Sequence, residues 1–155
     1  MIFVLCVLQI KVSVDWVQRR YNPYTAQQQI FYSDAKNVVD YTYTRSNNEP
    51  FSLSTVTNPL GINTTWSFFY TFYGKEVYGY SPSWSGSSQD GYLGELPISN
   101  GSETHHFLLI EPRDVIPEIY VMNEIDKMNR TYRIIENKQY GEYFIYYYQK
   151  ALAHK

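Results

Sequence analysis

The residues of this sequence best suited to bind a ligand lie in a loop that mixes aromatic rings with small polar residues. From 78 to 86 the chain reads YGYSPSWSG, which contains Tyr78, Tyr80 and Trp84. Exposed rings of this kind stack on the apolar face of a sugar, while neighbouring hydroxyls and amides bind its substituents. We therefore predict Tyr78, Tyr80 and Trp84 as substrate-binding residues. The alternative is that Tyr80 and Trp84 cover the core beneath a long loop.

Two carboxylates follow the most apolar internal run of the chain. The run at 105–110 predicts a strand buried on both faces, and Glu111 and Asp114 come directly after it. Sheets in α/β proteins place their ligands at the carboxyl ends of such strands. Glu111 and Asp114 are therefore suited to accept a sugar hydroxyl or to act as a base, the alternative being a helix cap or a loop salt bridge. We predict that they face the aromatic loop across one site.

No catalytic residue, metal ligand or cofactor site is predicted. The sequence contains no G-x-G-x-x-G, P-loop, G-x-S-x-G or H-E-x-x-H motif. A single cysteine excludes a cysteine-based metal site, and neighbouring His105 and His106 on a strand point to opposite faces. A small enzyme using Glu111 or Asp114 has no partner residues at a known spacing. The net charge of -2 argues against a nucleic-acid partner.

The 155 residues are enough for one domain with its own core, and their pattern alternates helices with strands. We predict an α/β or α+β fold: a small mixed sheet of about four strands, three packed helices and a C-terminal β-hairpin. The apolar face of the third helix should hold Ile119, Met122, Ile125 and Met128. The expected helices are 26–45, 63–74 and 117–129, and the expected strands are 51–56, 105–110, 131–136 and 142–149, the last two joined by 137–141.

The N-terminal segment is too apolar for a free terminus and too short to cross a bilayer. Residues 1–8 read MIFVLCVL, whereas a spanning helix needs about 20 apolar residues. The segment is either a buried N-terminal element or the end of a membrane helix whose beginning is missing. Residues typical of an interfacial anchor follow it: Trp16, Arg19, Arg20 and Tyr21. We therefore expect an apolar tail at 1–20, helical over 1–17 and poorly covered, and a soluble α/β domain at 21–155.

Several short motifs in the chain, taken in order, resemble one family of membrane enzymes. They are DYTY at 40–43, PF at 50–51, TNPL at 57–60, Trp66, YG at 73–74, YGY at 78–80, FLLIEP at 107–112 and YGEYF at 140–144. From Tyr21 to Gln149 the chain resembles the soluble C-terminal region of family 39-type glycosyltransferases, which are similar to dolichyl-phosphate-mannose protein mannosyltransferases.

The resemblance implies a domain on the extracytoplasmic side of the cell membrane. It implies membrane attachment through the N-terminal segment, and a lipid-linked sugar or a glycan acceptor as partner. The catalytic acidic residues of such enzymes lie in their membrane portion, so the resemblance transfers no catalytic residue to this chain. We expect a supporting role in acceptor or carrier binding. The alternative is a free-standing, non-enzymatic carbohydrate- or protein-binding module.

Overall fold

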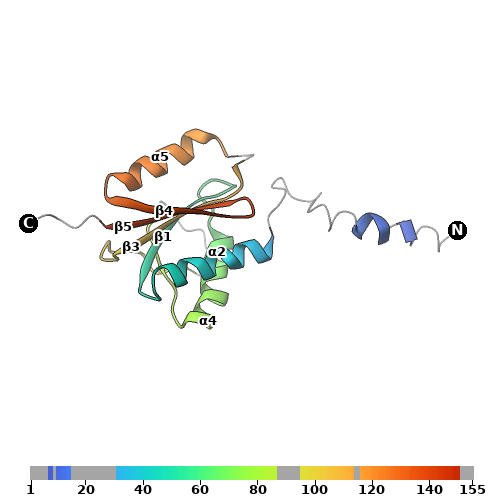
Figure 1. Cartoon of the computed structure of the whole chain (residues 1–155), viewed down its shortest axis with the longest axis horizontal. Coiled ribbons are helices and arrows are strands. Elements are labelled where there is room, and N and C mark those ends of the chain that lie inside the picture. Colours follow the sequence, from blue (N-terminus) through green and yellow to red (C-terminus); the bar gives the residue numbers. More distant parts are fainter. Residues whose placement is uncertain (1–6, 9, 15–30, 87–94, 114–115, 151–155) are drawn as a thin grey trace, which may run out of the picture.

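A computed structural model shows a mixed sheet with helices on both faces (Figure 1). It describes residues 7–8, 10–14, 31–86, 95–113 and 116–150. Asp114, Trp16 and the interfacial residues 19–21 lie outside the described residues, so the predictions that concern them stay predictions. The predicted α/β class is confirmed, with five strands where about four were expected.

The sheet has the strand order β2-β1-β3-β5-β4. Strands β1 (Phe51–Val56), β2 (Ser83–Trp84) and β3 (His105–Ile110) are parallel, and β3 lies in the centre of the sheet. The hairpin of β4 (Tyr132–Tyr140) and β5 (Tyr143–Lys150) completes the sheet, with β5 antiparallel to β3. The parallel strands give the sheet two distinct edges, one where they begin and one where they end, which we call the N-edge and the C-edge.

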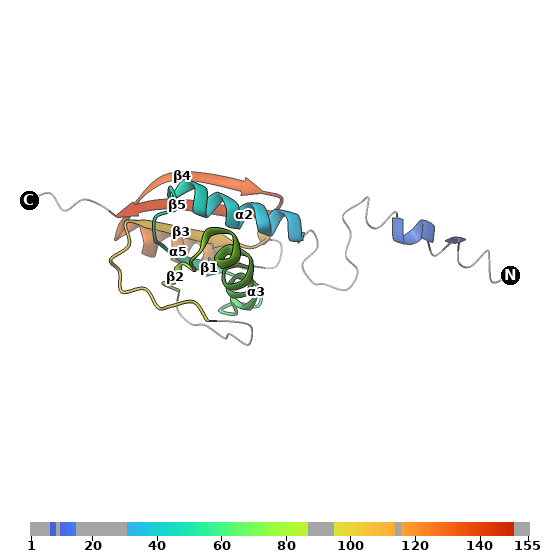
Figure 2. The same cartoon turned by 90° about the horizontal axis from the view of Figure 1, so that it is seen from below.

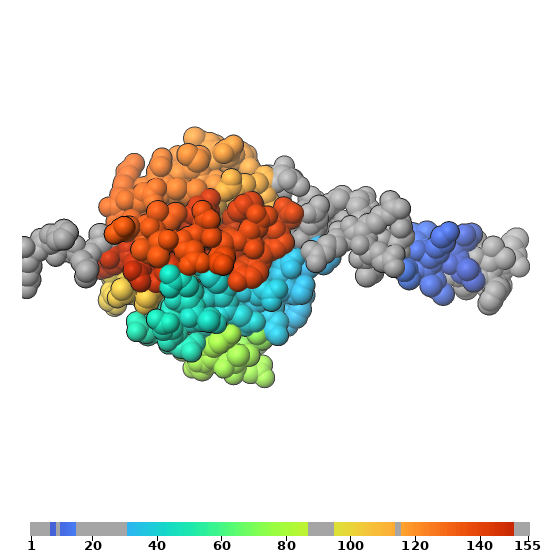
Figure 3. Space-filling model, in the orientation of Figure 1, coloured from blue at the N-terminus to red at the C-terminus, as the bar shows by residue number. Residues whose placement is uncertain are grey.

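Helices cover the two faces of the sheet unequally. One face carries α2 (Tyr32–Arg45) and a continuous helical segment made of α3 (Thr64–Phe68), the π-helix η1 (Phe69–Gly74) and α4 (Lys75–Tyr78). Among the described helices, only α5 (Glu118–Asn129) lies on the other face. Figure 2 shows α2 and α3 in front of the sheet with α5 behind it. In Figure 3 the outer strand β4, coloured orange, lies uncovered between the two helical layers, which agrees with its mostly exposed side chains.

Strand alternation sorts the apolar side chains into two cores. Phe51, Leu53 and Phe107 pack with α2 and the α3 segment, whereas Val56 and Leu108 pack with α5. All six residues of β3 are buried, as the continuous apolar run predicted for a strand covered on both faces. Each large side chain that is fully buried contributes about 1.5–3 kcal/mol, so these two cores hold the sheet in place.

The sequence located β1 and β3 within their observed bounds, but it missed or misplaced four features. The two-residue strand β2 and the π-helix were not predicted. The predicted connection at 137–141 was wrong, because β4 continues to Tyr140 and a two-residue turn follows. The predicted face of the third helix was partly wrong: Val121 and Met128 are buried, whereas Ile119 and Met122 are exposed.

The described part of the N-terminal segment is helical and exposed. Residues 7–8 and 10–14 have helical backbone, and every one of their side chains is exposed. This agrees with the predicted uncovered helix for the residues that are described. No described helix is long and apolar enough to span a membrane.

Candidate functional site

The structure places Tyr78 and Tyr80 in an aromatic cluster at the N-edge, where their hydroxyls are already bonded. The Tyr78 ring stacks on Tyr43 with centroids 4.1 Å apart, and the Tyr80 ring meets Tyr43 edge-on at 5.0 Å. The Tyr78 hydroxyl donates to Asp40 Oδ1 at 2.8 Å, and burial, followed by this bond, raises the pKa of Tyr78 to about 12. The Tyr80 hydroxyl donates to the carbonyl oxygen of Glu49 at 2.8 Å. These groups therefore join segments of the protein to one another.

Trp84 is part of the core. It forms half of strand β2, pairs with Leu53 of β1 and is 4% exposed. Gly86 lies against the indole so closely that a Cβ there would approach Cζ2 to 2.1 Å. Trp84 therefore presents no face on which a ligand could stack, and the core-covering alternative describes it better than the binding interpretation does.

Glu111 lies at the predicted strand end but points inward. Its carboxylate is 5% exposed, and it accepts hydrogen bonds from the Trp66 indole Nε1 at 3.1 Å and from the Asn58 backbone N–H at 2.9 Å. It also lies near Tyr143, whose pKa is raised by burial and, to a smaller degree, by the charges of Glu111 and Asp34. Glu111 therefore ties α3 and the loop after β1 to the sheet.

The two halves of the predicted site lie at opposite edges of the sheet. The Tyr80 ring lies 6.2 Å from the ring of Phe51, the first residue of β1, whereas Glu111 donates its backbone N–H to the carbonyl of Val56, the last residue. A six-residue strand separates its ends by about 16 Å at about 3.3 Å per residue. The structure therefore does not bring Tyr78, Tyr80 and Glu111 together, and Asp114 lies outside the described residues.

The two histidines do point to opposite faces, as the sequence predicted. His105 Nδ1 lies 2.7 Å from the Tyr147 hydroxyl on one face of the sheet. On the other face His106 is fully buried, with Nδ1 2.9 Å from Ser52 Oγ and Nε2 3.1 Å from Ser54 Oγ. Burial lowers the pKa of His106 to about 3, so its ring is neutral and exchanges hydrogen bonds with serines. Among the described residues no three metal-ligating side chains form a cluster.

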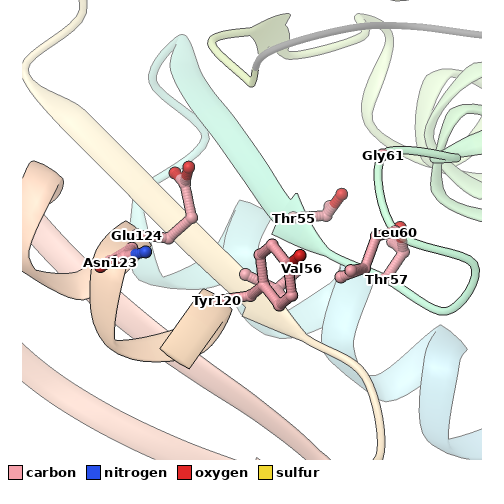
Figure 4. A pocket seen from close by; sticks show the side chains of 8 residues that line it. All are labelled: Thr55, Val56, Thr57, Leu60, Gly61, Tyr120, Asn123 and Glu124. Carbon is pink, nitrogen blue, oxygen red and sulfur yellow. The ribbon is translucent and has the colours of Figure 1, made fainter. Parts of the chain in front are cut away.

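The structure contains an open pocket at the C-edge that the sequence analysis did not identify. It lies between the end of β1 and the first turns of α5, with a volume of about 360 Å³, near the lower end of typical ligand pockets (Figure 4). Its lining comes from three segments: the strand end Thr55, Val56 and Thr57, the loop residues Leu60 and Gly61, and the helix residues Tyr120, Asn123 and Glu124.

The pocket combines an exposed ring with several polar groups. Tyr120 is 48% exposed, and Asn123 and Glu124 follow it at helical spacings of three and four residues, which places all three on one side of α5. Glu124 makes a surface ion pair with Lys127 at 3.3 Å, and Thr57 donates its hydroxyl to the carbonyl of Pro59 at 2.9 Å. The pocket can therefore stack a small ring on Tyr120 and offer it amide and carboxylate partners.

Two local features keep this pocket open. Strand β2 pairs only with Ser52 and Leu53, so on the side of β1 away from β3 no described strand pairs with Thr55 and Val56. Helix α5 buries Val121 and Met128, which turns Tyr120 away from the core. The i, i+3, i+4 spacing of Tyr120, Asn123 and Glu124 was visible in the sequence, but the incorrectly assigned apolar face concealed it.

Comparisons of the chain with protein-family models, with curated proteins and with solved structures found no match.

Proposed function

We propose that this chain is the extracytoplasmic domain of a glycosyltransferase in the cell membrane. The enzyme would transfer sugar from a polyprenyl-phosphate carrier, and this domain would bind the carrier-linked sugar or the acceptor. The observation that carries the proposal is the pocket at the C-edge, where the exposed Tyr120 ring lies beside Asn123 and Glu124. A ring for stacking with a few polar groups around it is the composition expected of a small-ligand site, and it suits a pyranose.

The membrane part of the proposal is supported by the N-terminal residues. In the described helical residues 7–8 and 10–14, the exposed apolar side chains are those of Val7, Leu8, Ile10, Val12 and Val14. Such a surface is unfavourable in water and favourable in the interfacial region of a bilayer. The family resemblance, which begins at Tyr21, implies a membrane segment ahead of that residue.

The role we propose is binding rather than catalysis. The lining contains a single carboxylate, Glu124, which is paired with Lys127 on the surface. Glu111, the carboxylate that the sequence favoured, is held by Trp66 and Asn58 inside the fold. A domain with these groups can orient a sugar, and the reacting groups would come from the membrane portion of the enzyme.

Calorimetric titration of the full chain tests the proposal, with a short-chain polyprenyl-phosphate mannose and methyl mannoside as probes. We expect the lipid-linked probe to bind and Tyr120→Ala to weaken it by about tenfold, which corresponds to one stacking contact of about 1.4 kcal/mol. Phe72→Ala is the matched control because Phe72 is also an exposed aromatic residue but does not line the pocket. Equal affinities for all three proteins would contradict the assignment of the pocket.

The alternative function, a free-standing carbohydrate-binding module, is favoured by a different observation. The described fold has a core on each face of its sheet, so it contains what an independent domain needs. The same titration separates the two functions. A module for free glycans should bind methyl mannoside as tightly as the lipid-linked probe, whereas a carrier-binding domain should prefer the lipid-linked one.

A further inference from the structure

Several exposed apolar side chains lie at the C-edge of the sheet, and one of them, Leu60, also lines the pocket. Five of them, which we call the apolar rim, are exposed to water and come from three separate parts of the chain: Tyr32, Leu60, Ile62, Phe68 and Ile119. Tyr32 and Ile119 are the most exposed of the five, at 65% and 61%. Water-facing apolar groups grouped at one edge indicate a surface that is covered in the functional state.

The topology places these residues at one edge. Leu60 and Ile62 belong to the loop that directly follows β1, and Ile119 is the second residue of α5, which follows β3. Tyr32 begins α2, and its ring lies 5.5 Å from Phe69, which in turn contacts Phe68. Two residues further along α2, Asp34 lies beneath Gly141 in the hairpin turn, which is also at the C-edge.

The N-terminal segment joins the domain at this same edge. Helix α2 begins there, so the chain that leads from the exposed apolar residues 7–14 reaches the fold beside Tyr32. The 16 residues between 15 and 30 can span at most about 55 Å at about 3.5 Å per residue. A bilayer that holds the N-terminal segment is therefore within reach of the apolar rim, and of the pocket next to it.

We infer that the apolar rim lies against the lipid bilayer and turns the pocket toward the headgroup layer. This inference rests on the proposed function and deepens it: the ligand would be a lipid-linked sugar phosphate taken from the membrane surface. Leu60 belongs to both the rim and the pocket, and Ile119 precedes the pocket residue Tyr120 in α5. Attachment is apolar rather than ionic, because Glu118 is exposed beside Ile119 and contributes a negative charge. Binding to neutral lipid should therefore be insensitive to salt.

Depth-dependent fluorescence quenching on the full chain tests this inference. With Cys6→Ser as background, single cysteines at 60 and 119 carry a fluorophore, and phosphatidylcholine vesicles carry spin-labelled lipid. Matched control labels replace Ile98 and Ile134, exposed apolar residues away from the rim. Ile98 pairs with Trp84 of β2 in an isolated parallel bridge, and Ile134 pairs with Tyr148 toward the N-edge. We expect labels at 60 and 119 to lose most of their fluorescence and the two control labels to keep theirs.

A partition measurement on the same vesicles gives the second readout. Leu60→Ser combined with Ile119→Ser should weaken partition at least about tenfold, because two apolar side chains would leave the bilayer and full burial of one is already worth about that factor. Ile98→Ser combined with Ile134→Ser should leave it unchanged.

Three outcomes would overturn the inference. The first is equal quenching at all four labelled positions, or none at any. The second is a rim label shielded from aqueous iodide in a monomeric protein without vesicles, which would place the N-terminal segment on the rim. The third is the same shielding in a dimer, which would place a second copy there. If the sugar binds but the rim labels are not quenched, this inference fails and the proposed function still stands. If the rim labels are quenched but no sugar binds, the rim contacts the bilayer and the pocket is not the sugar site.

Discussion

The two ends of strand β1 use aromatic side chains in opposite ways. At the N-edge the rings of Tyr78 and Tyr80 both pack on the ring of Tyr43, and the hydroxyls of all three bond to groups within the protein. At the C-edge Tyr120 lies half exposed beside polar side chains and an open volume. The comparison teaches that aromatic content does not mark a binding site; what marks it is a ring whose face remains free.

The largest difference between the two ends should appear in stability. Trp84→Ala removes a buried ring from the core and should lower the free energy of unfolding by about 3–5 kcal/mol. Tyr120→Ala, on the surface, should change it by less than about 1 kcal/mol. Urea unfolding measures both variants. Trp84→Phe keeps an aromatic ring and should fall between wild type and Trp84→Ala; an unchanged midpoint in Trp84→Ala would place that ring outside the core.

Acid should destabilise the packed N-edge through His106, which contacts Ser52 and Ser54 in β1. Its pKa is about 3 in the fold and about 6.5 in the unfolded chain, so between these values only the unfolded chain takes up the proton. Stability should therefore fall as pH decreases from about 6.5 to about 3, with a slope of up to about 1.4 kcal/mol per pH unit from this residue.

Unfolding free energies measured across this pH range provide the check. His106→Gln, compared with wild type at each pH, should show a smaller slope because it has no proton to gain. Parallel curves for the two proteins would mean that His106 titrates normally in the fold.

The two carboxylates at the C-edge should respond differently to the loss of charge. Glu111→Gln leaves a buried donor, either Trp66 Nε1 or the Asn58 N–H, with a poorer partner, so it should cost about 1–3 kcal/mol of stability. Its effect on sugar affinity should be small. Glu124→Gln should do the reverse: it should change stability by less than about 0.5 kcal/mol and lower the affinity for the sugar. Urea unfolding and calorimetric titration of the same two variants measure these changes in stability and in affinity.

The smallest effect is expected at Tyr78. Tyr78→Phe keeps the stack on Tyr43 and removes the hydroxyl that bonds to Asp40, so it should cost about 1 kcal/mol of stability. Affinity for the lipid-linked sugar should stay at the wild-type value. A loss of affinity with an intact fold would show that the loop containing Tyr78 belongs to the binding site.

The fold was largely predictable because the spacing of apolar residues in the sequence follows which face of each helix or strand is buried. The runs at 51–56 and 105–110 read as strands, and the stripe of Ala35, Val38, Val39 and Thr42 read as a helix face; the structure confirms all three. Strand β2 was missed because two residues carry no period, and Trp84 is held there by pairing with Leu53. Local patterns cannot reveal such a tertiary contact.

The site was predicted less well because exposure at a surface depends on how the elements pack. The sequence shows that Tyr78, Tyr80 and Tyr120 are all amphipathic, but only the packing shows which ring is enclosed. The rotation of α5 was decided by Val121 and Met128, and the apolar residues Ile119 and Met122 gave no indication of it. The position of Glu111 at a strand end was predicted correctly, whereas its inward orientation depends on Trp66, 45 residues away.

The most direct test of the pocket is a map of where the sugar binds. Backbone amide chemical shifts of the isotope-labelled full chain can be recorded while short-chain polyprenyl-phosphate mannose is added. We predict that the shifts concentrate at residues 55–61 and 120–124, which line the pocket, and that residues 78–84 remain unchanged. Shifts centred on residues 78–84, with none in α5, would contradict the account.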